Sequence, residues 1–352
     1  AHLFIQLIEA ENYKLKPKEG LSLINGCAIS LAHSCLSVGV ANQVLAAHQL
    51  ALALSIGAMG LGGAYFEPRM AKTRPHAFLE KVNSFLSQVL LLKSLRAQPF
   101  TKVANSFLCG NQIISCCLSA AQRAADTLNV ELNSSTDNPL AFVETGEIAI
   151  VGNFHSQAIS LEMDYLAVAM CSVINAAARR IELLVSGHSS ALPRGLCHDS
   201  GLNTGLLMLH ATASALAAEA RVLASPASCN NIPTLGGYED HVSMSMLAAL
   251  KCSEVTKIAA TLSAIEVLCA AQGWSLMQTE TNCDDPAGNL AKIVEVVRGV
   301  CPILGEQQQK GPHISILANS IIDGSLLRDL KQSIDIAPAE IETKLNMKGV
   351  SP

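Results

Sequence analysis

The chain has 352 residues, of which 50% are hydrophobic and 15% charged, and its 24 lysines and arginines against 29 acidic residues give a formal net charge of −5. A charged fraction this far below the roughly 25% of an average soluble domain excludes a disordered tail and a Glu/Lys-rich coiled coil. The negative charge argues against binding a phosphate backbone, so we expect no nucleic-acid partner. The length fits one large domain or two ordinary ones.

The N-terminal stretch AHLFIQLIEAEN has no basic segment and no cleavage signature, so no secretory signal is predicted. It also lacks an initiating methionine, which suggests a start within a longer protein. Gly20–Phe66 then contains no Asp, Glu, Lys or Arg. A membrane span is one interpretation, since about 20 apolar residues suffice, but polar residues interrupt this stretch throughout. We therefore predict no membrane contact, and a helix buried in a helical core or a subunit interface.

Ala/Leu-rich stretches separated by turn-forming motifs follow along the rest of the chain. We predict a helix in each of them: 75–95, 109–128, 155–186, 201–224, 239–272, 286–300 and 313–332. One β-hairpin is predicted, because Ala141–Glu144 and Glu147–Val151 alternate apolar and polar residues around a Thr145-Gly146 turn. The predicted fold is all-α, a bundle of long helices with this one small hairpin.

Twelve cysteines are scattered through apolar stretches, and none forms a Cys-x-x-Cys pair. Zinc-ribbon spacing is therefore absent, and reduced thiols packed as small hydrophobic groups in a cytoplasmic protein are the favoured interpretation. We expect no metal site, because the histidines also lack ligand spacing. Five of them are predicted to lie on the surface or to be hydrogen-bonded in the core: His155, His188, His198, His210 and His241. Of these, His241 is expected to lie nearest to a pocket.

Several loops between the helices carry motifs that composition does not explain. The segments KEGLSLING (Lys18–Gly26), NSSTDNPLAF (Asn133–Phe142), VGNFHSQ (Val151–Gln157) and YEDHVSM (Tyr238–Met244) resemble the aromatic amino-acid ammonia-lyase family, its histidine ammonia-lyase branch most closely. This resemblance runs without large gaps from residue 1 to about residue 275. We therefore predict a lyase-family helical core over 1–275, incomplete at its N-terminus, and a C-terminal helical segment over 276–352.

The resemblance implies a long-helix bundle of the ammonia-lyase (fumarase/aspartase-like) type that assembles as a homotetramer, with each site drawing on several subunits. Members of the family eliminate ammonia from histidine or an aromatic amino acid. They use an electrophilic methylidene-imidazolone group, which forms from an internal Ala-Ser-Gly, and a guanidinium that binds the substrate carboxylate. An amino-acid substrate or analogue is the implied ligand, and no metal or nucleotide is implied.

Four residues match positions that the family uses. The resemblance implies that Asn25 hydrogen-bonds the ring carbonyl and that Glu239 faces the substrate amine or side chain, so these are the candidate catalytic residues. It also implies that Asn138 helps to seat the substrate carboxylate and that Phe154 lines the pocket. Each has an ordinary alternative: an Asn-Pro pair is a common turn, a Phe fits a plain core, and a carboxylate is favourable in a helix's first turn.

Four other positions depart from the family pattern. Counting back from the TDNP motif places Lys102 where the family has glutamine and Asn105 where it has tyrosine. The same count places Leu108 at the carboxylate-binding arginine, and Tyr238 replaces a glutamine in the YEDH motif. Leucine cannot make the bidentate contact of an arginine. Since a hydrogen bond to a charged group contributes about 1.5–3 kcal/mol, we expect this loss to lower kcat/KM by two to several decades.

No Ala-Ser-Gly occurs at a suitable place in the sequence. Ala1-His2-Leu3 resembles the end of the family's ASGDLAPLAHL segment, which implies that the triad lies just upstream of residue 1. We therefore expect that this chain does not encode the electrophile. Two hypotheses remain open. The chain is a divergent or truncated lyase that needs an upstream segment, or it is a catalytically inactive paralogue acting as a scaffold or regulatory subunit of a hetero-oligomer.

Overall fold

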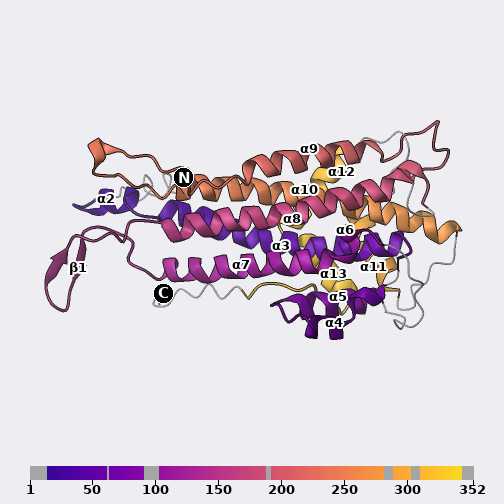
Figure 1. The fold of residues 1–352 in the computed structure, drawn as a ribbon, viewed down its shortest axis with the longest axis horizontal. Helices are drawn as coiled ribbons and strands as arrows, with labels where there is room; N and C mark the ends of the chain where they lie inside the picture. The colour runs from indigo at the N-terminus through magenta and orange to yellow at the C-terminus, as the bar shows by residue number, and fades with distance from the viewer. Residues whose placement is uncertain are drawn as a thin grey trace.

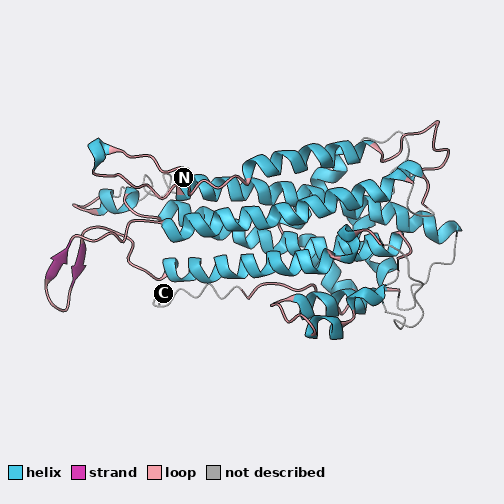
Figure 2. Ribbon diagram, viewed as in Figure 1, coloured by secondary structure: helices cyan, strands magenta, loops and turns pink. Residues whose placement is uncertain are grey.

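The structure is a computed structural model, and it describes residues 14–61, 63–90, 103–187, 192–280, 288–302 and 310–342. Long helices lie side by side along one axis, and a short hairpin projects from one end of the bundle (Figures 1 and 2). The predicted all-α fold with one small hairpin is therefore confirmed. In chain order the elements are α2 (Glu19–Ile24), α3 (Ala28–Ala58), η1 (Gly63–Phe66), α4 (Pro68–Lys72), α5 (Leu79–Leu90), α6 (Asn105–Leu108), α7 (Gly110–Leu132), β1 (Leu140–Phe142), β2 (Glu147–Ala149), α8 (Gln157–Ser186), η3 (Arg194–Leu196), α9 (Met208–Leu223), η4 (Leu235–Gly237), α10 (Ser245–Glu280), α11 (Asn289–Val300), α12 (Gly311–Ile322) and α13 (Ser325–Ser333).

The hairpin pairs β1 with β2 antiparallel, with Leu140 opposite Ala149. One predicted helix is divided in two. The stretch 313–332 forms most of α12 and most of α13, because Gly324 adopts a left-handed φ of 74° between them. A left-handed glycine ends a helix at little steric cost, so the chain turns at this point instead of continuing.

The charge-free segment forms α2 and α3, and α3 packs against α7, α8 and α10. By length and composition, Glu19–Ala58 could cross a membrane, with a mean hydropathy of 1.5, and its most apolar 18-residue window is 33% buried. The second half of α3 has a different environment. Nearly every side chain from Ala41 to Ala58 is buried against neighbouring helices, as expected for the core helix of a bundle.

A buried ion pair joins the helices of the bundle at its far end from the hairpin. The Arg180 guanidinium donates to both carboxylate oxygens of Glu266, from Nε at 2.6 Å and from Nη2 at 2.8 Å. The two side chains are 1% and 0% exposed. Ser55 donates to Glu266 Oε1 at 2.9 Å, and Arg180 Nη1 donates to the Ser106 carbonyl at 3.0 Å. The pair thereby links α3, α6, α8 and α10.

His48 on α3 is fully buried in the same region, and this makes stability sensitive to acid. Burial first, and then the charge of Arg180, lower the pKa of His48 to about 3, while the backbone of Ala259 opposes this shift. In the unfolded chain a histidine takes up a proton near pH 6.5. The folded protein does not take it up until about pH 3. The contribution of His48 to the free energy of unfolding is therefore fully present above pH 6.5. It is lost progressively as the pH falls below that value, by at most about 1.4 kcal/mol per pH unit.

We expect His48→Leu to remove this share of the acid sensitivity. The free energy of unfolding, measured by urea denaturation at pH 7.5, 6.0 and 5.0, should fall less steeply with pH in the variant than in the parent. His76→Leu, at an exposed histidine, is the matched control and should keep the parent's slope. An unchanged slope in His48→Leu would assign the acid sensitivity to other groups.

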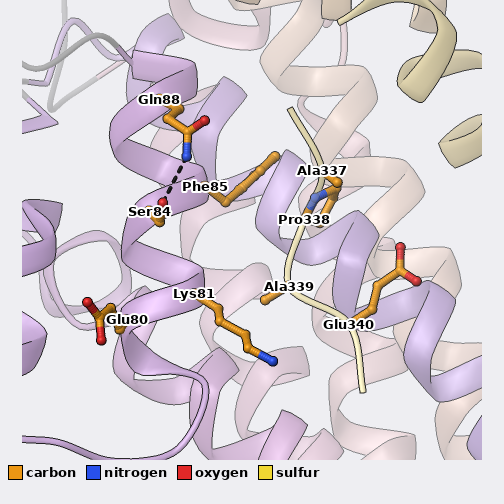
Figure 3. Close-up of a pocket in the computed structure, with 9 residues that line it drawn as sticks. All are labelled: Glu80, Lys81, Ser84, Phe85, Gln88, Ala337, Pro338, Ala339 and Glu340. Atoms are coloured by element: carbon orange, nitrogen blue, oxygen red, sulfur yellow. Dashed lines mark hydrogen bonds between the residues drawn. The ribbon is translucent and has the colours of Figure 1, made fainter. Parts of the chain in front are cut away.

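The chain after α13 is extended and is held by side-chain amides of two helices. Gln49 on α3 donates to the Ala339 carbonyl at 2.8 Å and accepts its N–H at 2.9 Å. Asn42 accepts the Ile341 N–H at 3.0 Å, and Gln122 on α7 accepts the Glu342 N–H at 2.8 Å. This segment borders a cavity of about 470 Å³ against α5, where Figure 3 shows α5 side chains facing it. The cavity shares no residue with the candidate site described below.

Candidate active site

The segments that carry the four matched residues gather at one end of the bundle. α2, the hairpin and the loop before α10 all project from this end (Figure 1). Asn25 directly follows α2, Asn138 lies two residues before β1, Phe154 precedes α8, and Glu239 lies in the loop before α10. Segments far apart in the sequence are therefore neighbours here.

Asn25 and Asn138 contact each other through a shared polar network. Asn25 Nδ2 donates to Asp137 Oδ1 and to the Asn138 carbonyl, both at 3.3 Å. Lys18 Nζ lies 2.7 Å from Asp137 Oδ2, and Ser22 donates to the same oxygen at 2.8 Å. These donors, the Lys18 ammonium first and then the Asn138 N–H and Ser22, hold the pKa of Asp137 well below its usual range. The carboxylate is thus the charged centre that ties α2 to the hairpin turn.

Gly26 makes this close approach possible. Its φ is +113°, and a Cβ at this position would lie 2.3 Å from the Thr136 carbonyl oxygen. Both the left-handed backbone and the missing side chain are therefore required for the turn after Asn25 to reach the turn before Asn138.

The amide of Asn138 has a fixed orientation. Its Oδ1 accepts the Val151 N–H at 2.9 Å, which closes the loop around the hairpin. Because an amide oxygen accepts and an amide nitrogen donates, the Nδ2 end is the donor that Asn138 can offer to a ligand.

Glu239 lies in a loop that is folded on itself. Its Oε2 accepts the Thr234 hydroxyl at 2.9 Å, and its carbonyl accepts the Thr234 N–H at 2.8 Å. Asn231 braces the other side of the loop, accepting the Val242 N–H at 2.6 Å. Tyr238 is 95% exposed. Glu239 is also exposed in this single chain, so it lies at the surface with its backbone carbonyl hydrogen-bonded to the Thr234 N–H.

Two contacts join this loop to the segment that carries Phe154, which is itself 38% exposed. His155 Nε2 lies 3.2 Å from His241 Nδ1. Beneath this pair, the buried Ser156 hydroxyl lies 2.9 Å from that of Ser243. Phe154 and Glu239 are therefore held at the same end of the bundle as Asn25 and Asn138.

The sequence analysis missed the residues that hold this end together. Asp137 and Lys18 belong to the two motifs that pointed to the site, but an Asp beside an Asn-Pro turn indicates only an ordinary capping role. A serine next to a phenylalanine carries no signal of a buried cluster. Among the described residues, no group of three or more His, Cys, Asp or Glu could hold a metal ion.

Of the four positions that depart from the family pattern, Tyr238 adjoins Glu239, and two others lie away from this end. Lys102 lies outside the described residues. Asn105 and Leu108 are on α6, toward the opposite end of the bundle (Figure 1), and Leu108 is 37% exposed. α6 contacts α8 at Arg180, which lies 23 residues beyond Gln157, the first residue of α8. At 1.5 Å per helical residue this is a separation of roughly 35 Å along α8, so the two sets of residues cannot meet within one chain.

Comparisons with known proteins agree with this architecture. The family model for aromatic amino acid lyases matches residues 1–299. Histidine ammonia-lyase of Alkaliphilus oremlandii is 34% identical over 92% of this chain and 63% of its own length, and that of Symbiobacterium thermophilum is 33% identical over 92% and 64%. The chain thus spans somewhat less than two thirds of these curated relatives.

Solved structures give the same assignment. Histidine ammonia-lyase from Trypanosoma cruzi superposes with a TM-score of 0.83 at 28% identity, covering 96% of this chain and 67% of that one. Tyrosine aminomutase from Streptomyces globisporus gives 0.86 at 28% identity, covering 95% and 68%. With the family model matching most of the chain and a long-helix bundle that presents the family's motifs at its end, this protein belongs to the aromatic amino acid lyase family.

Proposed function

We propose that this chain supplies the Asn25, Asn138, Phe154 and Glu239 part of an amino-acid ammonia-lyase site, and that the whole site forms between chains of a cytoplasmic homo- or hetero-tetramer. The carrying observation is that Asn25 and Asn138 share one network at the hairpin end, while α6 lies at the other end. The reaction would be α,β-elimination of ammonia from histidine or an aromatic amino acid.

The exposed surface at the hairpin end supports assembly. Large apolar side chains stand exposed around the candidate site on three separate segments: Ile24, Val143, Ile148, Ile150 and Leu235. A second exposed row follows one face of α8, where Leu161, Tyr165 and Val168 recur at helical spacing. Large apolar side chains exposed in groups are typical of protein–protein interfaces, and a second chain that covers this end would exclude water from the site.

The residues present fit the family's methylidene-imidazolone group, which when bound supplies the electrophile that activates the substrate amine. Asn25 is the residue that would hold its carbonyl. Both hydrogen bonds of Asn25 Nδ2 are long, at 3.3 Å, whereas Asp137 also accepts shorter bonds from Lys18, Ser22 and the Asn138 N–H. Asn25 can therefore redirect an N–H without undoing the turn. The Nδ2 end of Asn138 would bind the carboxylate.

A specific observation favours the alternative, an inactive paralogue that serves as scaffold or regulatory subunit. Leu108, whose side chain is 37% exposed, stands at the position where the resemblance places the carboxylate-binding arginine. A hydrocarbon cannot compensate the charge of a carboxylate, so a site built from this α6 alone would bind amino acids weakly. In a mixed assembly the arginine would come from a different chain.

Ligand binding to the purified chain tests the proposal. The elimination products urocanate and cinnamate serve as probes, and their Kd is measured by calorimetric titration. We expect Asn138→Asp to weaken both by about tenfold or more, because the carboxylate keeps the bond from Val151 but loses the donor and repels an anion. The neutral amide of cinnamate should be affected much less.

Asn153→Asp, on the same loop and hydrogen-bonded to the Ser135 carbonyl, is the matched control and should leave both affinities within threefold. Failure of the purified chain to bind either product, alone or mixed with an active lyase of the family, would contradict the proposal. If the chain alone releases no ammonium, but its addition changes the rate of ammonium release by the active lyase, the regulatory alternative is favoured over an independent enzyme.

A further inference from the structure

We infer that Ser156 is a positioning residue. Its buried hydroxyl is the centre of a chain of four serine hydroxyls that fixes the Glu239 loop and the Phe154 segment on the first turn of α3, beside Asn25. The inference rests on the proposed function, because it names the device that sets the relative positions of the proposed site's parts.

The four hydroxyls are buried and contiguous. Ser156 Oγ lies 2.9 Å from Ser243 Oγ and 2.7 Å from Ser245 Oγ, and Ser245 Oγ lies 3.1 Å from Ser30 Oγ. The residues are only 5–8% exposed. Three segments distant in sequence therefore meet through side-chain oxygens, within a largely buried region.

Counting the hydroxyl protons fixes a single donor-to-acceptor direction along the four serines. Each hydroxyl donates once. Ser30 donates to the Cys27 carbonyl at 3.0 Å, so Ser245 must donate to Ser30. Ser156 must then donate to Ser245, and Ser243 to Ser156. Every hydroxyl proton then has an acceptor, in the order Ser243, Ser156, Ser245, Ser30 and the Cys27 carbonyl. Ser156 accepts from Ser243, in the loop before α10, and donates to Ser245, the first residue of α10.

Ser156 does not cap the helix that follows it. It is the residue directly before α8, where a serine normally caps the helix with its hydroxyl. Here the side chain makes no cap hydrogen bond, and the backbone has φ −96° and ψ 37°. The hydroxyl is directed to the serine chain instead, which indicates that joining the segments is its task.

Each segment that the chain joins carries a predicted site residue a few positions away. Ser30 follows Asn25, Ser156 follows Phe154, and Ser243 follows Glu239. On the solvent side the His155–His241 contact at 3.2 Å joins two of the same segments. The inner hydroxyls and the outer imidazoles together leave little freedom between Phe154 and Glu239.

Hydrogen exchange and ligand affinity, measured on the full chain, test this inference. In Ser156→Ala we expect backbone amides of 230–242 to exchange about tenfold faster, because two hydrogen bonds are lost, and cinnamate to bind about tenfold more weakly. Ser243→Ala, at the end of the chain with one bond, should give about a threefold change in each. Ser156→Thr keeps the hydroxyl and should restore both.

Ser320→Ala is the matched control, since Ser320 is buried and donates one hydrogen bond to Leu317 of its own helix. It should lower global stability without altering exchange in 230–242 or affinity. Unchanged exchange in Ser156→Ala, or no rescue by threonine, would overturn the positioning role. If the parent binds neither cinnamate nor urocanate, the proposed function fails, while the exchange of 230–242 still decides the role of Ser156.

Discussion

Replacing Arg180 with methionine should lower the free energy of unfolding by about 3–5 kcal/mol, because it leaves the Glu266 carboxylate buried without its partner. The carboxylate is 0% exposed, and among the described residues it would keep the Ser55 hydroxyl as its one side-chain donor. One hydrogen bond does not offset the loss of solvation of a full charge. Urea denaturation at neutral pH and constant protein concentration measures the change.

Two further variants identify the cause. Arg179→Met removes the neighbouring arginine, whose side chain is 70% exposed and pairs with Glu182 on the surface, so we expect a change of at most about 1 kcal/mol. The double variant Arg180→Met with Glu266→Leu removes both charges and should recover much of the lost stability. If it is as unstable as Arg180→Met, the destabilisation comes from lost packing rather than from the unpaired carboxylate.

Much of the fold follows from patterns that the sequence displays directly. The long apolar stretches 109–128 and 155–186 become α7 and α8 with shifts of a few residues at their ends, because burial of a wide apolar face dominates helix formation. The hairpin forms around Gly146 as its turn chemistry predicts. The division of 313–332 was missed, although Asp323-Gly324 is a turn signal, since the apolar pattern continues on both sides of it.

The candidate site, like the fold, could be predicted from the sequence only in part. The motifs identified Asn25 and Asn138, and the structure brings these two together. The sequence could not show that α6 lies toward the opposite end of the bundle from them (Figure 1), because positions across a bundle depend on how the helices pack. Nor could it show the serine chain, since each serine lies in a different segment and its hydroxyl acquires a partner only after folding.

Leu108→Arg should strengthen the binding of cinnamate and urocanate by about 10- to 150-fold in the assembled protein, which corresponds to the 1.5–3 kcal/mol of a charged hydrogen bond. Leu108 is 37% exposed, so an arginine can be accommodated there without burying an unpaired charge. Calorimetric Kd values measure the gain. The neutral amide of cinnamate should gain little, and Leu108→Lys should gain less than Leu108→Arg, because an ammonium cannot make the bidentate contact.

Met70→Arg adds the same charge at a position with the same 37% exposure on α4, and it should leave the affinities unchanged. Equal tightening by Met70→Arg would mean nonspecific attraction. The decisive measurement is the double-mutant cycle with Asn138→Asp. The two positions are too far apart to couple within one chain, so their effects on cinnamate binding should be additive there. A coupling of 0.5 kcal/mol or more, also seen when the two single variants are mixed, would require α6 of one chain to face the hairpin end of another around the same carboxylate.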